Sequence, residues 1–187
     1  MRLPDGRVGL VRLRTDGTRS FRETPREGLP ANPSHPKLFH TTRPDSAAAI
    51  KAGGFSGKRR TSQDGFSGAF FGEGTYLHTD ASHSKEYTEG TRAYGYGDET
   101  QISAAAHVEK PFVVHAKPGD SNPGALMHNA LVRAEVAKPG EKLSPPEITR
   151  RLQELGYDAV EVKQPKFSHE IAGSQLVVFD PKKLEAR

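Results

Sequence analysis

The densest group of residues that could do chemistry lies between positions 74 and 87. Tyr76 falls in a strand-like run, and Ser84 and Tyr87, three positions apart, share one face of the helix expected after it. Two tyrosine rings can stack on a flat heteroaromatic ring while a serine hydroxyl bonds a polar substituent of that ring. The same residues also fit a plainer interpretation, two structural tyrosines and a helix capped at Ser82.

Other catalytic motifs are missing from the sequence. It has no glycine-rich dinucleotide fingerprint, no Walker loop, no His-Glu-x-x-His motif and no Gly-x-Ser-x-Gly elbow. His78 and His83 are five positions apart, so they do not share a helix face. The chain has no cysteine, which excludes disulfides, cysteine-ligated metals and thiol catalysis. We therefore expect chemistry without a bound metal.

Composition favours an α+β or β-rich domain with many loops and rules out a helical bundle. The chain has 187 residues, a hydrophobic fraction of 34%, 19 glycines and 14 prolines. No run of apolar residues is long enough for a membrane span, and the first residues lack the apolar stretch of a signal peptide. We therefore expect no membrane partner, and a location in the cytoplasm or export by a route that needs no signal.

The excess positive charge is concentrated at the N-terminus. The net charge is +4, and residues 1–30 hold seven arginines against four acidic residues. Residues 7–22 predict a β-hairpin turning at Asp16-Gly17, and a proline-rich stretch follows over 23–36. We therefore expect a basic hairpin and linker over 1–36 and a main domain over 37–187. The basic segment fits either a solvated hairpin or an arm that contacts nucleic acid or an acidic partner.

The main domain is expected to contain short strands. Strand-like runs occur at 37–40, 74–78, in two pieces of 102–116, at 158–163 and at 176–179. The last run is fully apolar, which is typical of a central strand. Few helices separate these runs, so a compact mixed sheet is predicted.

Three short helices are expected between the strands. The first covers 45–52, with Asp45 as the N-cap and two glycines as the stop. The second covers 82–88. The third follows a capping box at Ser144 and Glu147 and ends at Gly156. Residues 117–130 are expected to form a loop.

Four motifs in chain order resemble those of the ADP-ribosyltransferase superfamily, in the His-Tyr-Glu branch that includes the poly(ADP-ribose) polymerases and bacterial and phage transferases. The resemblance spans about residues 37–184. The matching segments are residues 38–42 with His40; residues 72–76 with Gly74 and Tyr76, together with Ser84 and Tyr87; residues 156–160; and residues 174–181 with Gln175. It implies an α+β fold with a mixed, split β-sheet and few short helices, preceded here by the N-terminal hairpin.

The resemblance also implies a role for each matching residue, with NAD as the substrate and no metal. His40 would bond the adenosine ribose, and the Thr41 backbone would read the nicotinamide amide. Tyr76, in the motif that includes Gly74, and Tyr87 would enclose the nicotinamide ring. The implied catalytic residues are Gln175, Tyr76 and His40, and the implied NAD-binding residues are His40, Thr41, Gly74, Tyr76, Ser84 and Tyr87.

Two residues depart from the family pattern. Thr41 stands where many members carry glycine, and Gln175 stands where they carry the catalytic glutamate that holds the ribose 2′-hydroxyl. An amide accepts a hydrogen bond from that hydroxyl but brings no negative charge. Glu170, just before the last strand, is a candidate replacement carboxylate, and it fits a solvated loop charge as well. The departures point to single transfer rather than chain elongation.

The sequence thus predicts a mono-ADP-ribosyltransferase, as a toxin, an effector or a phage-encoded modifier. Its acceptor would be a protein or a nucleic acid, and an immunity protein or antitoxin is a candidate partner. Two alternatives remain open at this point: an NAD glycohydrolase on the same fold, and a catalytically silent module of this fold that binds nucleotide, RNA or protein.

Overall fold

The structure, a computed structural model, describes residues 9–13, 19–23, 32–56, 69–84, 100–117, 120, 122–163 and 174–187. The chain divides into two compact units, Met1–Asn32 and Pro33–Arg187. Tyr87 and Glu170 lie outside the described residues, as do most of the expected helix 82–88 and most of the loop before the last strand.

The first unit contains two paired strands. β1 (Gly9–Leu13) and β2 (Arg19–Glu23) run antiparallel, with Gly9 opposite Glu23 and Leu13 opposite Arg19. The turn predicted at Asp16-Gly17 lies outside the described residues.

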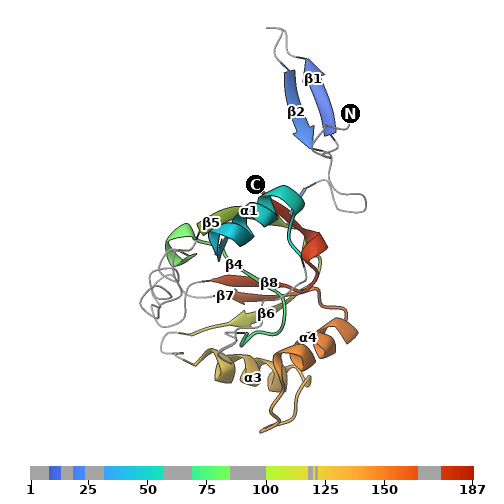
Figure 1. Ribbon diagram of the computed structural model, residues 1–187. Helices are drawn as coiled ribbons and strands as arrows, with labels where there is room; N and C mark the ends of the chain where they lie inside the picture. Colours follow the sequence, from blue (N-terminus) through green and yellow to red (C-terminus); the bar gives the residue numbers. More distant parts are fainter. Residues whose placement is uncertain are drawn as a thin grey trace. The chain divides into compact units, whose positions relative to one another are not determined.

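The second unit is built on a seven-stranded mixed sheet (Figure 1). The strands are β3 (His35–Thr42), β4 (Thr75–His78), β5 (Thr100–Ala106), β6 (Pro111–His115), β7 (Ala159–Lys163), β8 (Gln175–Val178) and β9 (Leu184–Ala186). Their order in the sheet is β6-β7-β8-β4-β3-β5-β9. β6 and β7 are parallel, and the other neighbours are antiparallel. The expected mixed α+β sheet with few helices is therefore confirmed, and the apolar strand β8 has partners on both sides as predicted.

Several short helical segments begin at prolines. They are α1 (Pro44–Gly53), α3 (Pro123–Arg133), α4 (Pro145–Glu154) and the 3-10 turn η1 (Pro181–Lys183). Proline suits the first turn of a helix because its missing N–H has no intrahelical partner there. At α4, the Glu147 carboxylate accepts from the Ser144 backbone N–H at 2.9 Å, as the capping box predicts.

Two local predictions are wrong. Residues 117–130 are not all loop, because Asn122 caps α3 through its side chain, which accepts from the Ala125 N–H at 2.9 Å. Asp45 is not the cap of α1, because Pro44 starts the helix and leaves Arg43 in the extended cap position. The C-terminal residues also form a short edge strand, β9, which no sequence pattern predicted.

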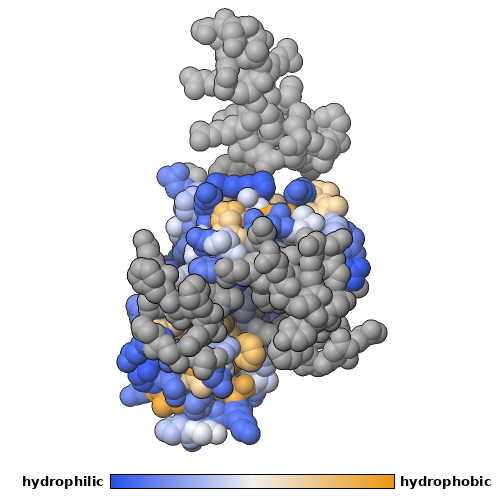
Figure 2. All heavy atoms as spheres, turned by 90° about the vertical axis from the view of Figure 1, so that its left-hand side faces the viewer, coloured by the Kyte–Doolittle hydropathy of each residue, from blue (hydrophilic) through white to orange (hydrophobic). Residues whose placement is uncertain are grey.

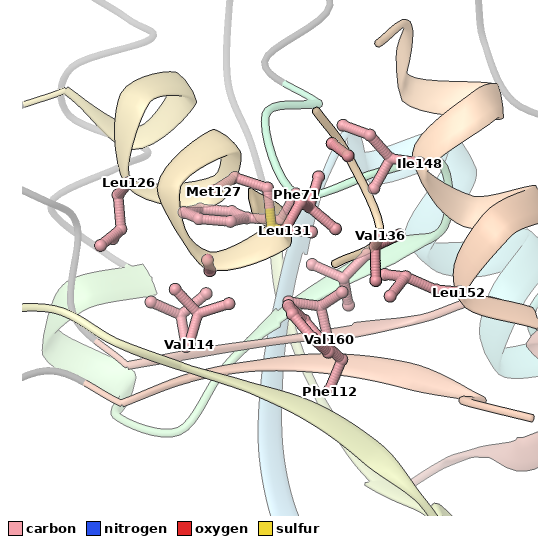
Figure 3. Close-up of a cluster of buried hydrophobic side chains, with 14 of the residues drawn as sticks. Phe71, Phe112, Val114, Leu126, Met127, Leu131, Val136, Ile148, Leu152 and Val160 are labelled. Carbon is pink, nitrogen blue, oxygen red and sulfur yellow. The ribbon is translucent and has the colours of Figure 1, made fainter. Parts of the chain in front are cut away.

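Hydrophobic cores lie on both faces of the sheet. Figure 1 shows α3 and α4 on one face and α1 on the other. Figure 3 shows side chains of both helices, such as Leu131 and Leu152, directed toward the sheet residues Val114 and Val160. The opposite core contains Leu77 and residues of α1 and β5. Figure 2 shows that the described side chains on one side of the molecule are largely hydrophilic, with hydrophobic ones in smaller patches between them.

Candidate functional site

The backbone pairing of the sheet is reduced to one position between β3 and β4. β4 pairs with β8 through all four of its residues, but it pairs with β3 at one position, Phe39 opposite His78. Beyond this bridge the His40 imidazole bonds β4 in place of backbone, with its Nδ1 2.8 Å from the Tyr76 backbone oxygen. A side chain thus satisfies a carbonyl that a continuous ladder would have paired with backbone.

The bond to Tyr76 defines the protonation of His40. A carbonyl oxygen only accepts, so Nδ1 carries the hydrogen. Burial lowers the pKa of His40 below its ordinary value of 6.5, and the bond to the Tyr76 carbonyl opposes that effect without cancelling it. At neutral pH the ring is therefore uncharged, and Nε2 keeps a lone pair that accepts a hydrogen bond. The ring also packs edge-on against Phe55, with centroids 5.6 Å apart.

A tight turn holds Tyr76 by its hydroxyl group. The hydroxyl donates to the Gly72 oxygen at 2.8 Å and accepts from the Phe71 N–H at 3.1 Å. The turn is itself fastened to α4, because the Thr149 hydroxyl donates to the Glu73 oxygen at 2.9 Å and accepts from the Glu73 N–H at 2.7 Å. Tyr76 is half-buried beside the core, so the hydroxyl fixes the direction of the ring.

Steric crowding explains why glycine occupies positions 72 and 74. A Cβ on Gly72 would lie 2.8 Å from the Thr149 hydroxyl oxygen, and φ at Gly72 is +105°, which favours glycine. A Cβ on Gly74 would lie 2.7 Å from the Val178 oxygen of β8. Gly74 therefore permits the close approach of β8, and its predicted contact with NAD stays a prediction.

Thr41 and Ser84 are bonded to each other. The Thr41 hydroxyl lies within hydrogen-bond reach of both the hydroxyl and the backbone oxygen of Ser84, the latter at 3.1 Å. Ser84 is fully buried. The Ser84 hydroxyl, which the family resemblance assigns to NAD binding, thus already has a protein partner, and the threonine that replaces the family glycine provides it.

Ser84 belongs to a helical turn over 81–84, and Asp80 caps this turn. The Asp80 carboxylate accepts from the Ser82 N–H at 2.7 Å and from the Ser82 hydroxyl at 2.5 Å. These bonds hold the pKa of Asp80 below its ordinary value. The Gln101 amide of β5 donates to the Ala81 oxygen at 2.9 Å, which fastens the turn over the sheet. The cap is therefore Asp80, not Ser82 as in the plainer interpretation.

Gln175 begins β8 next to this arrangement. It lies opposite His78 on β4 and Val162 on β7. Directly opposite residues share a face of the sheet, as do residues two apart on one strand, so Tyr76, His78 and Gln175 share one face. His40 follows Phe39, the residue opposite His78, so it projects from the other face of the sheet, where its ring packs against Phe55 of the opposite core.

The structure thus brings together most of the residues that the sequence nominated. His40 contacts the Tyr76 backbone, Tyr76 shares a face with Gln175, and Thr41 contacts Ser84. Tyr87 and Glu170 lie outside the described residues, so nothing is said of their positions. The sequence indicates His78 only as a candidate metal ligand. Its place opposite Gln175 follows from strand register, which a single sequence does not give.

A cavity of about 450 Å³ lies elsewhere in the second unit. Its lining includes Phe70, Met127, His128 and Ile148, from the turn before β4 and from α3 and α4. None of the nominated residues that the structure describes lines it. Within the described segments, no group of three or more histidine and acidic side chains could hold a metal ion. The helices described here also include none with the length and apolarity needed to cross a membrane.

The fold and the site define a mixed α+β domain with its candidate site where β3 and β4 separate. No protein-family model and no curated protein matches the chain. Among solved structures, the chain is similar to one from the crystal structure of the M. tuberculosis MbcT–MbcA toxin–antitoxin complex, at 12% identity and a TM-score of 0.43, over 83% of this chain and 82% of that chain. Because a TM-score under 0.5 does not establish a common fold, we base the function on this chain's own residues.

Proposed function

We propose that this chain is a mono-ADP-ribosyltransferase that cleaves NAD between nicotinamide and ribose and transfers ADP-ribose to a protein or nucleic acid. The observation that carries the proposal is the arrangement of three residues. A neutral, buried His40 is bonded to the backbone of Tyr76, whose ring shares a sheet face with Gln175. The motif resemblance, in the same residues, supplies the reaction class.

The reaction balances without redox chemistry. The bond from ribose C1′ to the nicotinamide nitrogen breaks, and its electron pair leaves with nicotinamide. An acceptor nucleophile then bonds C1′ and releases a proton to solvent. The protein mainly has to orient the dinucleotide and stabilise positive charge on the ribose.

Five of the nominated residues would orient the dinucleotide. Nε2 of His40 accepts from a ribose hydroxyl of the adenosine half, and the ring of Tyr76 stacks on nicotinamide. The Thr41 backbone and the Ser84 hydroxyl read the carboxamide once the hydroxyl bond between their side chains opens. Gln175 accepts from the ribose 2′-hydroxyl. Since an amide lacks the charge of a carboxylate, the rate is expected to be lower by about 10²- to 10³-fold.

Labelled NAD tests the transfer. The protein is incubated with a cell lysate and with NAD labelled in its adenine half. The labelled macromolecules are then treated with protease or with nuclease, and the treatment that releases the label identifies the acceptor class. We expect label on a macromolecule, its loss with Tyr76→Ala, and its retention with the cavity variant His128→Ala. Nicotinamide release without attached label would instead establish an NAD glycohydrolase.

The second candidate is a silent binding module. Two observations favour it: the Ser84 hydroxyl is already bonded to Thr41, and Gln175 carries no charge. Such a module would bind NAD, RNA or a protein without turnover, and its basic N-terminal segment would give nucleic-acid binding a steep salt dependence. An antitoxin or immunity protein as the partner, and a role as toxin, effector or phage modifier, belong to the proposal of the active enzyme.

A further inference from the structure

The cavity lined by α3, α4 and the turn before β4 has the size and the lining of a small-molecule site. Its volume of about 450 Å³ lies within the range of roughly 300–1,000 Å³ that such sites occupy. Most of its lining is apolar, including Phe70 in the turn, Met127 and Leu131 on α3, and Leu143 and Ile148 at the start of α4. An apolar ligand would therefore gain free energy by leaving water for this cavity.

The Phe70 ring borders the cavity and is open to solvent. Phe70 is 43% exposed, whereas its neighbours Ala69 and Phe71 are buried. The ring lies close to the first turn of α3, because a Cβ built on Gly124 would lie 3.6 Å from a Phe70 ring carbon. A ligand that enters here would cover part of the exposed ring, which adds apolar contact area to its binding.

The charged side chains around the cavity favour an anion. Among the described residues of the lining, Glu141 is the one carboxylate, and the Arg151 guanidinium donates to both of its oxygens, at 2.5 and 3.2 Å. Lys142 also lines the cavity and is exposed, and within the described part of the chain it has no ion-pair partner. The negative charge of the lining is thus already paired, and the positive charge of Lys142 is available to a ligand.

Two helices begin at the cavity and add to its positive potential. α3 starts at Pro123 and α4 starts at Pro145, and Gly124 and Pro145 both line the cavity. The N-terminal end of a helix carries a partial positive charge. Glu147 in the capping box offsets this charge at α4, but α3 has no acidic residue in its first turn. The start of α3 therefore acts in the same direction as Lys142.

We propose that this cavity binds a small organic carboxylate, whose apolar chain or ring enters beside Phe70 and whose carboxylate stays at the rim, within reach of Lys142. A neutral ligand would leave the charge of Lys142 unused, and a cation would be repelled by it. The cavity is separate from the candidate site for NAD, so the inference goes beyond the proposed function and does not depend on it.

Octanoate, a straight-chain carboxylate, is the probe that tests the proposal. The chain contains two methionines, Met1 and Met127, so a sample labelled at the methionine methyl carbons gives two signals, and Met127→Leu identifies the one in the cavity. We expect the Met127 signal to move saturably as octanoate is added. Octanol should bind about two- to fivefold more weakly, the effect of one partly exposed ion pair, and octylammonium more weakly still.

Variants with matched controls locate the ligand. Gly124→Leu adds a side chain beside Phe70, and leucine favours a helix more than glycine does, so the variant should fold. It should weaken octanoate binding about tenfold, because it displaces about two methylenes of the ligand. Gly53→Leu, at a helical glycine with nothing within 4 Å, should leave the Kd unchanged. Lys142→Gln should weaken octanoate binding about two- to fivefold, and Lys182→Gln, outside the lining, should not.

The site is overturned if the Met127 signal does not move saturably with octanoate, or if Gly124→Leu binds octanoate as tightly as wild type. The preference for an anion is overturned if octylammonium or octanol binds as tightly as octanoate, or if Lys142→Gln has no effect. None of these measurements uses NAD. A protein that releases no nicotinamide but binds octanoate would therefore contradict the proposed function and support this inference.

Discussion

His40 and Tyr76 are joined side chain to backbone, with the Nδ1 of His40 2.8 Å from the Tyr76 carbonyl oxygen. The bond lies next to the single bridge between β3 and β4, so one imidazole spans the place where the ladder stops. It also fixes the tautomer, because Nδ1 must hold the hydrogen and Nε2 is left to accept. One contact therefore satisfies the Tyr76 carbonyl and leaves Nε2 of His40 able to accept a hydrogen bond.

The lowered pKa of His40 predicts a pH dependence of stability. Between the folded pKa and the ordinary value of 6.5, the unfolded chain binds more protons than the folded chain. The free energy of unfolding therefore rises with pH across this window. The contribution of His40 is lost as the pH falls through the same window. Denaturant unfolding from about pH 5 to about pH 8 measures the slope.

His40→Gln isolates this contribution, because glutamine keeps a donor for the Tyr76 carbonyl but does not titrate in this range. We expect a shallower slope than wild type in that variant. His115→Gln, at an exposed site on β6, is the matched control for the loss of a histidine. A His40→Gln slope as steep as that of wild type would show that another group is responsible.

Gly74→Ala should destabilise the domain. The added Cβ would lie 2.7 Å from the Val178 oxygen, and backbone on both sides must then shift. Overpacking of this kind costs about 1–3 kcal/mol. Gly53→Ala at the end of α1 is the control, because nothing lies within 4 Å of its Cβ, and it should be neutral or slightly stabilising. Equal unfolding midpoints for the two variants would contradict the close approach of β8.

Thr41→Ala should strengthen NAD binding. Removing the threonine hydroxyl frees the Ser84 hydroxyl from one protein partner, while the backbone at position 41 stays as it is. Exchange of one hydrogen bond is worth about 2- to 10-fold in Kd. Thr42→Ala, one residue along the same strand, should leave Kd unchanged. Weaker binding in Thr41→Ala, measured by calorimetry, would mean that the threonine hydroxyl itself contacts NAD.

Local signals in the sequence predicted much of the fold. Some signals act over only a few residues, so a single sequence is enough to identify them. Examples are the capping box at Ser144, the turn glycines and the apolar run of β8. α3 was missed because Pro123-Gly124 is also typical of a turn, although Asn122 as the cap and Pro123 in the first turn are helix-start signals as well. β9 has three residues, too few for a periodicity.

The candidate site was predictable in its residue types but not in its contacts. Tyr76 and Gln175 stand out because they lie in or beside strand-like runs and match motifs. The placement of His78 beside Gln175 depends on the pairing of β4 with β8, which are far apart in the chain. The bond between Thr41 and Ser84 likewise depends on how the turn 81–84 lies over β3, and no local pattern encodes that.

Nicotinamide release from NAD by the purified protein tests the central claim most directly, run beside Tyr76→Ala and Gln175→Glu. The account predicts slow release by wild type, loss of release in Tyr76→Ala, and release faster by about 10²- to 10³-fold when Gln175→Glu restores a carboxylate. Tyr76→Phe, which keeps the ring, should retain release if it folds. No release from wild type or from Gln175→Glu, with both proteins folded, would contradict an NAD-cleaving enzyme.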